Sequence, residues 1–217
     1  MAQLSRDRIV DAAVAIVDEA GPDALTMRAV AQRLGAGAMS LYRHVASREE
    51  LLDLVLGSMT TEVQHAPLTG DWREDVAATA RDLRAALLRR PHLTALLAAR
   101  TSRGVAGLPL LERTVGILRA AGFGRRGAVL ASEALANYVT GAAIWQAAGL
   151  AGPDGDPMAP AREQAASLTG ELPPEAFPNL GWVGAKLAAG SADDRFEFGL
   201  RSLLDGFAAY LERRTAS

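Results

Sequence analysis

The sequence predicts an all-α protein. Alanine, leucine and arginine, which are strong helix formers, dominate the composition, whereas β-branched and aromatic residues are scarce. Apolar residues recur at the three- and four-residue spacing that places them on one face of a helix, most clearly between residues 5 and 20. The 217 residues are enough to bury a substantial core, and the absence of cysteine excludes disulfides and thiolate metal sites.

Four helices are expected in the first 60 residues. Their approximate ranges are 5–20, 27–33, 38–44 and 47–63. Gly21 and Pro22 end the first helix, and Gly35 lies in the tight turn after the second. Ser47 to Glu50 reads Ser-Arg-Glu-Glu, a capping box that opens the fourth helix. These signals predict a small helical module with two short helices in its middle.

A larger helical body follows the break at Ala66-Pro-Leu-Thr-Gly70. Its expected helices are 71–90, 92–100, 108–121, 125–150 and 193–213. Residues 151–192 are rich in glycine, proline and aspartate, so we expect a poorly ordered connection there with one short helix at 160–169. The expected domains are therefore 1–65 and 66–217, with the fourth helix bridging the boundary.

Charge is distributed unevenly along the chain. The net charge of −2 gives no global argument for nucleic-acid binding. Between Thr26 and Arg48, however, there is no carboxylate, and this stretch holds His44 and arginines 28, 33, 43 and 48. Two short helices joined by a glycine turn and carrying positive charge are typical of a helix-turn-helix that enters the DNA major groove. An ordinary helical hairpin is the alternative, and the absence of acids favours DNA binding.

Several motifs resemble the tetracycline-repressor (TetR) family over residues 5–60. They are Ile9-Val-Asp-Ala-Ala13, Gly21, Leu25-Thr-Met-Arg-Ala-Val-Ala-Gln-Arg-Leu-Gly35, Leu41-Tyr-Arg-His-Val45 and Leu51-Leu-Asp53. Asp71-Trp-Arg-Glu-Asp75, Leu-Leu-Arg-Arg-Pro91, Phe196-Glu-Phe-Gly-Leu200 and Leu203-Leu-Asp-Gly206 resemble, more loosely, the regulatory domain of the tetracycline-repressor branch. The resemblance implies a homodimeric, ligand-responsive repressor that binds palindromic double-stranded operator DNA.

The resemblance also assigns roles within the helix-turn-helix. The positions that correspond to phosphate contacts, which fix register without reading sequence, are Thr26, Tyr42, His44 and Arg48. The positions that correspond to base-edge contacts are Arg28, Ala38, Met39, Ser40 and Arg43. The apolar residues Val30, Leu34, Leu41 and Val45 are expected in the core, because apolar positions at helical spacing normally face inward.

A small-molecule site is expected in the body. The helix at 125–150 carries a mixture of apolar rings and hydrogen-bonding groups suited to a ligand cavity, at Asn137, Tyr138, Thr140, Trp145 and Gln146, although Trp145 could equally be core. Gly141 is a further expected ligand-binding residue on this helix. The residues near the positions where members of the resembled family line their pocket are Gln64, His65, Arg100 and Thr101. Tetracycline repressors hold a magnesium-drug chelate with histidine and glutamate, whereas this chain has Gln64, Ala98 and Trp145 at or near those places. We therefore expect a largely apolar or aromatic effector, with no metal and no cofactor.

The last helix carries an apolar stripe for which two roles are open. The stripe consists of Phe196, Leu200, Leu203, Phe207 and Tyr210. In the family that this chain resembles, the last two long helices of one subunit pack with those of its partner as a four-helix bundle. The resemblance therefore implies that the stripe is a dimer interface. Burial inside the monomer is the alternative.

Other classes of function find little support. Gly122-Phe-Gly-Arg-Arg-Gly127 matches a dinucleotide-binding pattern, but a helix precedes it and Gly122 is expected to cap that helix. The three histidines are scattered, and neither a nucleophile elbow nor a Walker loop is present, so no enzyme is expected. Without a signal-like or membrane-spanning apolar run, we expect a cytoplasmic protein. The remaining alternative is a helical small-molecule-binding or scaffold protein that does not touch DNA.

Overall fold

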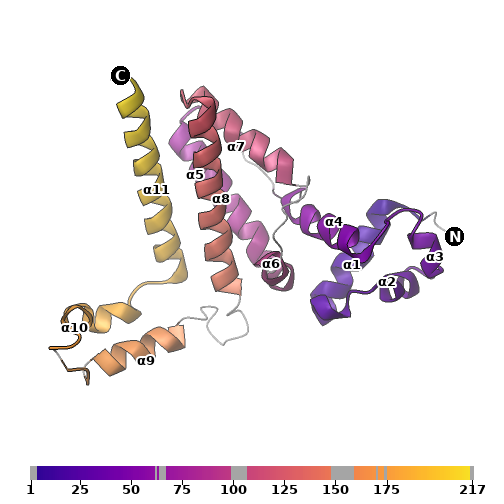
Figure 1. The fold of residues 1–217 in the computed structure, drawn as a ribbon, viewed down its shortest axis with the longest axis horizontal. Helices are drawn as coiled ribbons and strands as arrows, with labels where there is room; N and C mark the ends of the chain where they lie inside the picture. Colours follow the sequence, from indigo (N-terminus) through magenta and orange to yellow (C-terminus); the bar gives the residue numbers. More distant parts are fainter. Residues whose placement is uncertain are drawn as a thin grey trace. The chain divides into compact units, whose positions relative to one another are not determined.

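All the regular structure that the computed structural model describes is helical, which confirms the all-α class (Figure 1). The described residues are 4–61, 63, 67–98, 107–147, 159–169, 171–173 and 175–215. The chain divides into two compact units, residues 1–140 and 141–217. Each unit is considered by itself below.

The first unit begins with a compact group of short helices, residues 6–61, which we call the reading module. Its elements are α1 (Arg6–Ala20), η1 (Pro22–Ala24), α2 (Met27–Arg33), α3 (Ala38–Leu41) and α4 (Arg48–Thr61). The predicted caps are confirmed: the Thr26 hydroxyl accepts a hydrogen bond from the Ala29 amide at 3.0 Å, and the Ser47 hydroxyl accepts one from the Glu50 amide at 3.0 Å. The short 3₁₀ turn η1 was not predicted, because Gly21 and Pro22 were interpreted only as a helix stop.

The core of the reading module is closed by its own side chains. Contacts join α1 to α2 and α4, and α2 to α3. The largest side chains with no exposed surface are Ile9, Val17, Leu25, Val30, Leu41, Val45, Leu51 and Val55. Removing a side chain of this kind from water contributes about 1.5–3 kcal/mol. The predicted core positions Val30, Leu41 and Val45 are confirmed, whereas Leu34 is half-buried.

Four helices continue the chain as the body. They are α5 (Trp72–Arg89), α6 (Pro91–Ala98), α7 (Leu108–Ala120) and α8 (Arg125–Ala147). The Trp72 and Phe123 rings meet edge to face with centroids 5.9 Å apart, and Arg113 Nε donates to Thr79 Oγ1 at 3.3 Å. Because the start of α5 meets the end of α7, these two helices run antiparallel.

The reading module is joined to the body at several places. Helix α4 contacts α5 and α7, while α1 and η1 contact α6. The connection between α4 and α5 is held by the buried carboxylate of Asp75, which accepts hydrogen bonds from the Thr69 amide (2.7 Å), the Thr69 hydroxyl (2.9 Å) and the Gly70 amide (3.2 Å). An ion pair between Asp18 of α1 and Arg90 at the end of α5 adds a further link.

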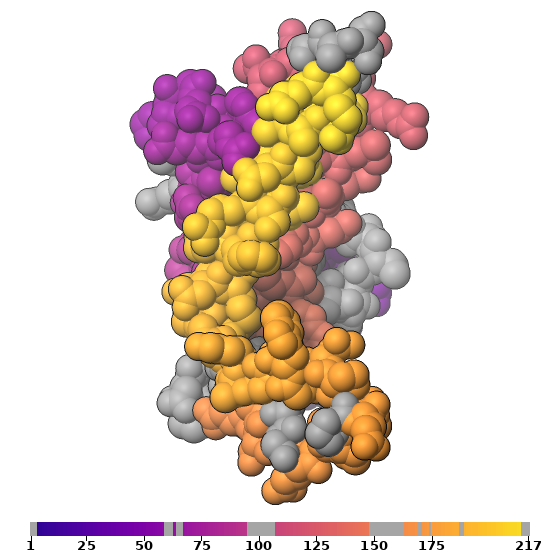
Figure 2. Space-filling view, turned by 90° about the vertical axis from the view of Figure 1, so that its left-hand side faces the viewer, coloured from indigo at the N-terminus to yellow at the C-terminus, as the bar shows by residue number. Residues whose placement is uncertain are grey.

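The second unit contains the end of α8 and the last helices of the chain. These are α9 (Ala159–Thr169), α10 (Pro178–Val183), η3 (Gly184–Ala188) and α11 (Ala192–Thr215), and η3 contacts both α9 and α10. Figure 2 shows this group (orange) at the surface beside the start of α11 (yellow). Helix α9 lies where the short helix was predicted, but α10 and η3 occupy a stretch for which an irregular connection was expected.

Candidate nucleic-acid interface

The turn between α2 and α3 is built around a glycine. Gly35 has a φ of +62°, which is unfavourable for residues with a side chain, so an alanine there would be strained. The Ala36 amide returns to the Ala31 carbonyl at 2.9 Å, and Gly37 then caps α3. This geometry turns the chain sharply and starts α3 immediately after α2.

Helix α3 has one buried anchor and an exposed face. Leu41 has no exposed surface, whereas Met39 is 80% and Tyr42 47% exposed. Arg43 is exposed and donates to the Ser40 hydroxyl at 3.4 Å. The predicted helix over 38–44 ends at Leu41, and residues 42–44 continue as a turn in which the Val45 amide reaches the Leu41 carbonyl at 2.9 Å. The buried leucine thus fixes a short helix on which Ala38 and Met39 are exposed.

Two of the predicted phosphate-contacting residues have local hydrogen bonds that orient them. The Thr26 hydroxyl accepts from a backbone amide, and its own proton stays available for donation to a phosphate. Arg48 uses Nε to donate to the Leu25 carbonyl at 3.0 Å. The side chain of Arg48 remains exposed, as do those of Tyr42 and His44.

The predicted base-contacting residues also lie at the surface of the reading module. Arg28, Ala38, Met39 and Arg43 are exposed, and Ser40 is half-buried. Both sets come from α2, α3, the turn after α3 and the start of α4. The contact between α2 and α3 brings the side chains of these two helices into one region.

The predicted cationic patch includes Arg33, but in the structure this arginine is paired with a carboxylate. Its guanidinium forms two hydrogen bonds, at 2.7 and 2.5 Å, with the carboxylate of Glu19 in α1. The hydrogen bond with Arg33 lowers the pKa of Glu19, and the same hydrogen bond raises the pKa of Arg33. The charge of Arg33 is therefore compensated inside the module, and the patch consists of Arg28, Arg43, His44 and Arg48.

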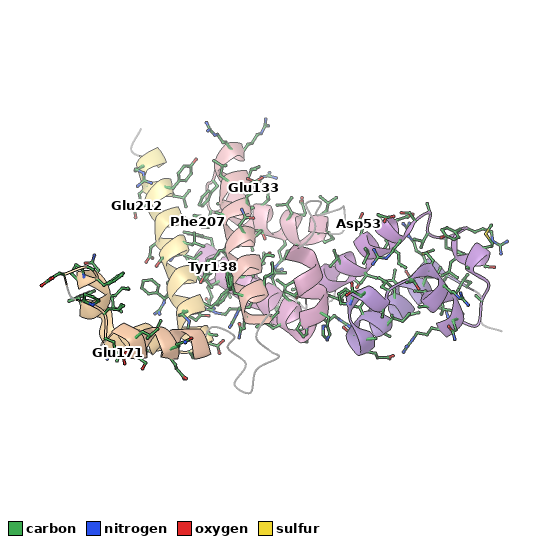
Figure 3. The ribbon with its side chains drawn as sticks, turned by 60° about the horizontal axis from the view of Figure 1, so that its bottom comes forward. Asp53, Glu133, Tyr138, Glu171, Phe207 and Glu212 are labelled. Carbon is green, nitrogen blue, oxygen red and sulfur yellow. The ribbon has the colours of Figure 1, made fainter. Side chains whose placement is uncertain are left out.

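The predicted effector residues are only partly within the described structure. Gln64, His65, Arg100 and Thr101 lie outside the described residues. On α8, Asn137 is exposed, and Tyr138 and Gly141 are half-buried. Figure 3 labels Tyr138 on this helix. Trp145 is 64% exposed, so the interpretation of this ring as core is wrong for the single chain.

The apolar stripe of α11 is only partly available to a partner. Phe196 and Leu200 are 2% and 0% exposed within the single chain, which corrects their expected role as interface residues. Leu203, Phe207 and Tyr210 are half-buried. Between the two corrected positions, Phe198 is 70% exposed, a feature that the sequence analysis missed. An apolar stripe alone does not reveal whether the chain or a partner covers it.

The glycine-rich run of residues 122–127 lies at the junction between two helices, α7 and α8. Helix α7 precedes the glycine-rich run, and Gly122, with a φ of +97°, ends it as predicted, with its amide bonded to the Arg119 carbonyl at 3.0 Å. Within the described part of the chain, no three histidine or acidic side chains come together as a metal site. None of the described helices is both long and apolar enough to cross a membrane.

Both parts of the chain match family descriptions. "Bacterial regulatory proteins, tetR family" matches residues 9–55, and "Tetracyclin repressor-like, C-terminal domain" matches residues 66–211. The chain is 32% identical over 216 residues to the HTH-type transcriptional repressor DrrR1 of Streptomyces coeruleorubidus, covering 97% of this chain and 80% of that protein. It is 39% identical over 148 residues to an HTH-type transcriptional regulator of Saccharopolyspora erythraea, covering 66% of this chain and 63% of that protein.

Solved structures agree with these matches. The protein ActR of Streptomyces coelicolor, in its apo form, is 35% identical with a TM-score of 0.85, covering 99% of both chains. The structure of ActR with actinorhodin is 36% identical with a TM-score of 0.85, covering 97% of this chain and 99% of that one. The chain therefore belongs to the tetracycline-repressor family of bacterial transcriptional regulators.

Proposed function

We propose that two copies of this chain bind palindromic operator DNA through α2 and α3, repress transcription, and release the DNA when a small, largely apolar or aromatic molecule binds the body. The observation that carries the proposal is the exposed surface formed by α3 and the turn after it, anchored by buried Leu41, with Tyr42 and Arg43 exposed in the turn. A surface of this kind suits insertion into a major groove. The functional boundary in this proposal lies between residues 65 and 66, and the protein acts in the cytoplasm by binding rather than by catalysis.

Dimerisation follows from the small size of the recognition helix. One short helix offers few base contacts, and a two-fold dimer doubles them across half-sites about 34–36 Å apart. Helix α8 offers a self-complementary surface for such a dimer, since Val129 and Leu130 are 51% and 52% exposed. Arg126 and Glu133, both exposed, flank this pair symmetrically, so an antiparallel copy would place each arginine near the partner's glutamate. The half-buried Leu203, Phe207 and Tyr210 of α11 are proposed to lie at the same interface.

The effector is proposed to be apolar or aromatic because of the residues that α8 presents. Tyr138 and Trp145 supply rings, while Asn137 supplies hydrogen-bonding groups and Gly141 adds no bulk. The similar protein ActR is bound to actinorhodin in one structure. Gln64, His65, Arg100 and Thr101 complete the proposed site. Release of DNA requires that the effector bind more tightly to the conformation that does not fit the operator.

The DNA part of the proposal is tested with duplex DNA and two arginine variants. An operator is first selected from random duplexes with the full chain, and binding is then measured by gel shift over a salt series. Arg43→Ala is expected to cost about 1–3 kcal/mol and to relax discrimination at one base pair. Arg48→Ala is expected to weaken all sequences alike, because a phosphate contact reads no base.

The alternative function makes different predictions for the same experiment. A helical ligand-binding or scaffold protein would show no steep salt-dependent retention on heparin or random duplex DNA. Wild-type affinity for both arginine variants would contradict the assignment of the recognition helix. A magnesium-dependent thermal stabilisation by tetracycline would contradict the proposed class of effector.

A further inference from the structure

We infer that the ion pair between Asp18 and Arg90 fixes the orientation of the reading module on the body, and thereby the separation of the two reading helices in a dimer. The inference rests on the proposed function, because the separation matters only when two modules must fit one operator. It assigns a role to two charged residues that belong neither to the proposed DNA-contacting set nor to the proposed effector-contacting set.

The ion pair joins two parts of the first unit that are far apart in sequence. Asp18 lies in the last turn of α1, and Arg90 is the residue that ends α5, 72 positions later. The side chain of Arg90 is 24% and that of Asp18 37% exposed. The pair between Arg33 and Glu19, inside the reading module, is more open, at 39% and 60%. The link between module and body is thus the better shielded of these two neighbouring ion pairs, and water screens it less.

Arg90 is carried by a rigid corner between α5 and α6. Thr94 has no exposed surface, and its hydroxyl donates to the Leu87 carbonyl at 2.6 Å across the corner. The Thr94 amide donates to the Arg90 carbonyl at 3.0 Å, and Pro91 fixes the backbone at the start of α6. Because the corner is braced from both sides, a displacement of α6 moves Arg90 with it.

A continuous set of contacts leads from this corner to the DNA-facing surface. Helix α6 contacts both α1 and η1, and η1 leads directly to Leu25. The Leu25 carbonyl holds Nε of Arg48, a proposed phosphate contact. A change at α6 can therefore reach Arg48 through η1, in addition to any movement of α4 as a whole.

The first test measures the orientation directly and needs no DNA. The chain has no cysteine, so Ala46→Cys in the reading module and Glu112→Cys in α7, both exposed, can carry spin labels without background. Distances between the labels are measured in dimers diluted with unlabelled chain. Asp18→Asn and Arg90→Gln are each expected to broaden the distance distribution, and the exchanged pair D18R/R90D is expected to narrow it again. Glu19→Gln, which breaks the neighbouring ion pair inside the module, is the matched control and should leave the width unchanged.

The second test measures the consequence for DNA. Affinity is compared for the selected operator and for the same operator with one base pair inserted at its centre. Asp18→Asn and Arg90→Gln are expected to reduce the ratio of these affinities by about five-fold or more, a typical size for coupling between sites. A merely structural role would lower both affinities and leave their ratio unchanged.

The outcomes separate the two proposals. The variants Asp18→Asn and Arg90→Gln could bind DNA and yet leave unchanged the width of the label-to-label distance distribution or the ratio of the two operator affinities. Either result would overturn the role of the ion pair and leave the proposed function standing. If the wild-type chain binds no DNA, the proposed function fails, and the operator part of this inference fails with it. Broadening by Glu19→Gln equal to that by Asp18→Asn would also overturn the inference, because the effect would then not depend on the link to the body.

Discussion

Two regions of this regulator, residues 4–58 of the first unit and residues 163–195 of the second, differ in how far they bury their large apolar side chains. In residues 4–58, most of the large aliphatic side chains are buried, and eight of them have no exposed surface. Between residues 163 and 195 of the second unit, none of the side chains that the structure describes is buried. The large apolar side chains exposed in that stretch are Leu168 (47%), Phe177 (42%), Leu180 (39%) and Trp182 (88%).

This difference indicates which contacts supply the free energy of unfolding in each region. The reading module is stabilised by removing its own apolar surface from water, which also selects one packing arrangement. Helices α9 and α10 depend more on their contacts with η3. An exposed apolar group of this size is typical of a surface that another molecule covers. Three predictions with matched substitutions test this contrast.

The largest effect is expected from Leu41→Ala. This side chain is fully buried under α3, and its truncation leaves a cavity in a small core, so the free energy of unfolding should fall by about 2–5 kcal/mol. Met39→Ala on the same helix is the matched control: its side chain is 80% exposed, and the free energy should change by less than about 0.5 kcal/mol. Urea unfolding of both variants measures the difference. Equal stabilities would contradict the interpretation of Leu41 as the anchor of α3.

The next effect concerns two carboxylates whose pKa values are lowered in different surroundings. The hydrogen bond from the Thr69 amide is the largest cause that lowers the pKa of Asp75 from its ordinary value of 3.8. Burial opposes this shift, whereas the hydrogen bonds from the Thr69 hydroxyl and the Gly70 amide add to it. Hydrogen bonds from the amide and hydroxyl of Ser191 likewise lower the pKa of Asp194, which is exposed at the start of α11. Ionisation of either group therefore stabilises the fold.

The sign of the pH dependence follows from these directions. The stabilisation is complete above the ordinary value of 3.8 and is lost as the pH falls through the lowered values. Asp75→Asn should thus lower the urea midpoint at pH 7, and its difference from wild type should shrink as the pH falls from 5 to 2. Asp194→Asn should show the same trend with a smaller amplitude, because water screens an exposed group. A larger effect at Asp194 would reverse the proposed contrast between the units.

Much of the reading module could be predicted from sequence because its signals are local. The range 27–33, the Thr26 cap and the glycine turn at Gly35 all depend on residues within four positions of one another. Except for the half-buried Ser40, the candidate DNA-contacting residues are exposed for the same reason, since helical periodicity separates them from Leu41 and Val30. The all-α class required only composition and periodicity.

Other features depend on contacts between distant residues, which periodicity does not encode. The partner of Arg33 is Glu19, on a different helix, so the sequence alone counted Arg33 in the DNA-facing patch. Phe196 and Leu200 were assigned to an interface because an apolar stripe is the same whether its own chain or a partner covers it. The short elements η1, α10 and η3 follow or contain proline and glycine, residues that usually indicate a loop.

The smallest effect is expected from Trp182→Ser. At 88% exposure, this ring makes little contact with its own chain, so the free energy of unfolding of dilute protein should change by less than about 0.5 kcal/mol. If another molecule covers the ring, the change should appear instead as a loss of association, measured by sedimentation across a concentration series. Trp72→Ser is the control: this ring packs edge to face on Phe123, and its loss should destabilise the chain itself. A strong destabilisation by Trp182→Ser in dilute protein would mean that residues 163–195, like residues 4–58, depend on apolar contacts within the chain, and the contrast between these two regions would fail.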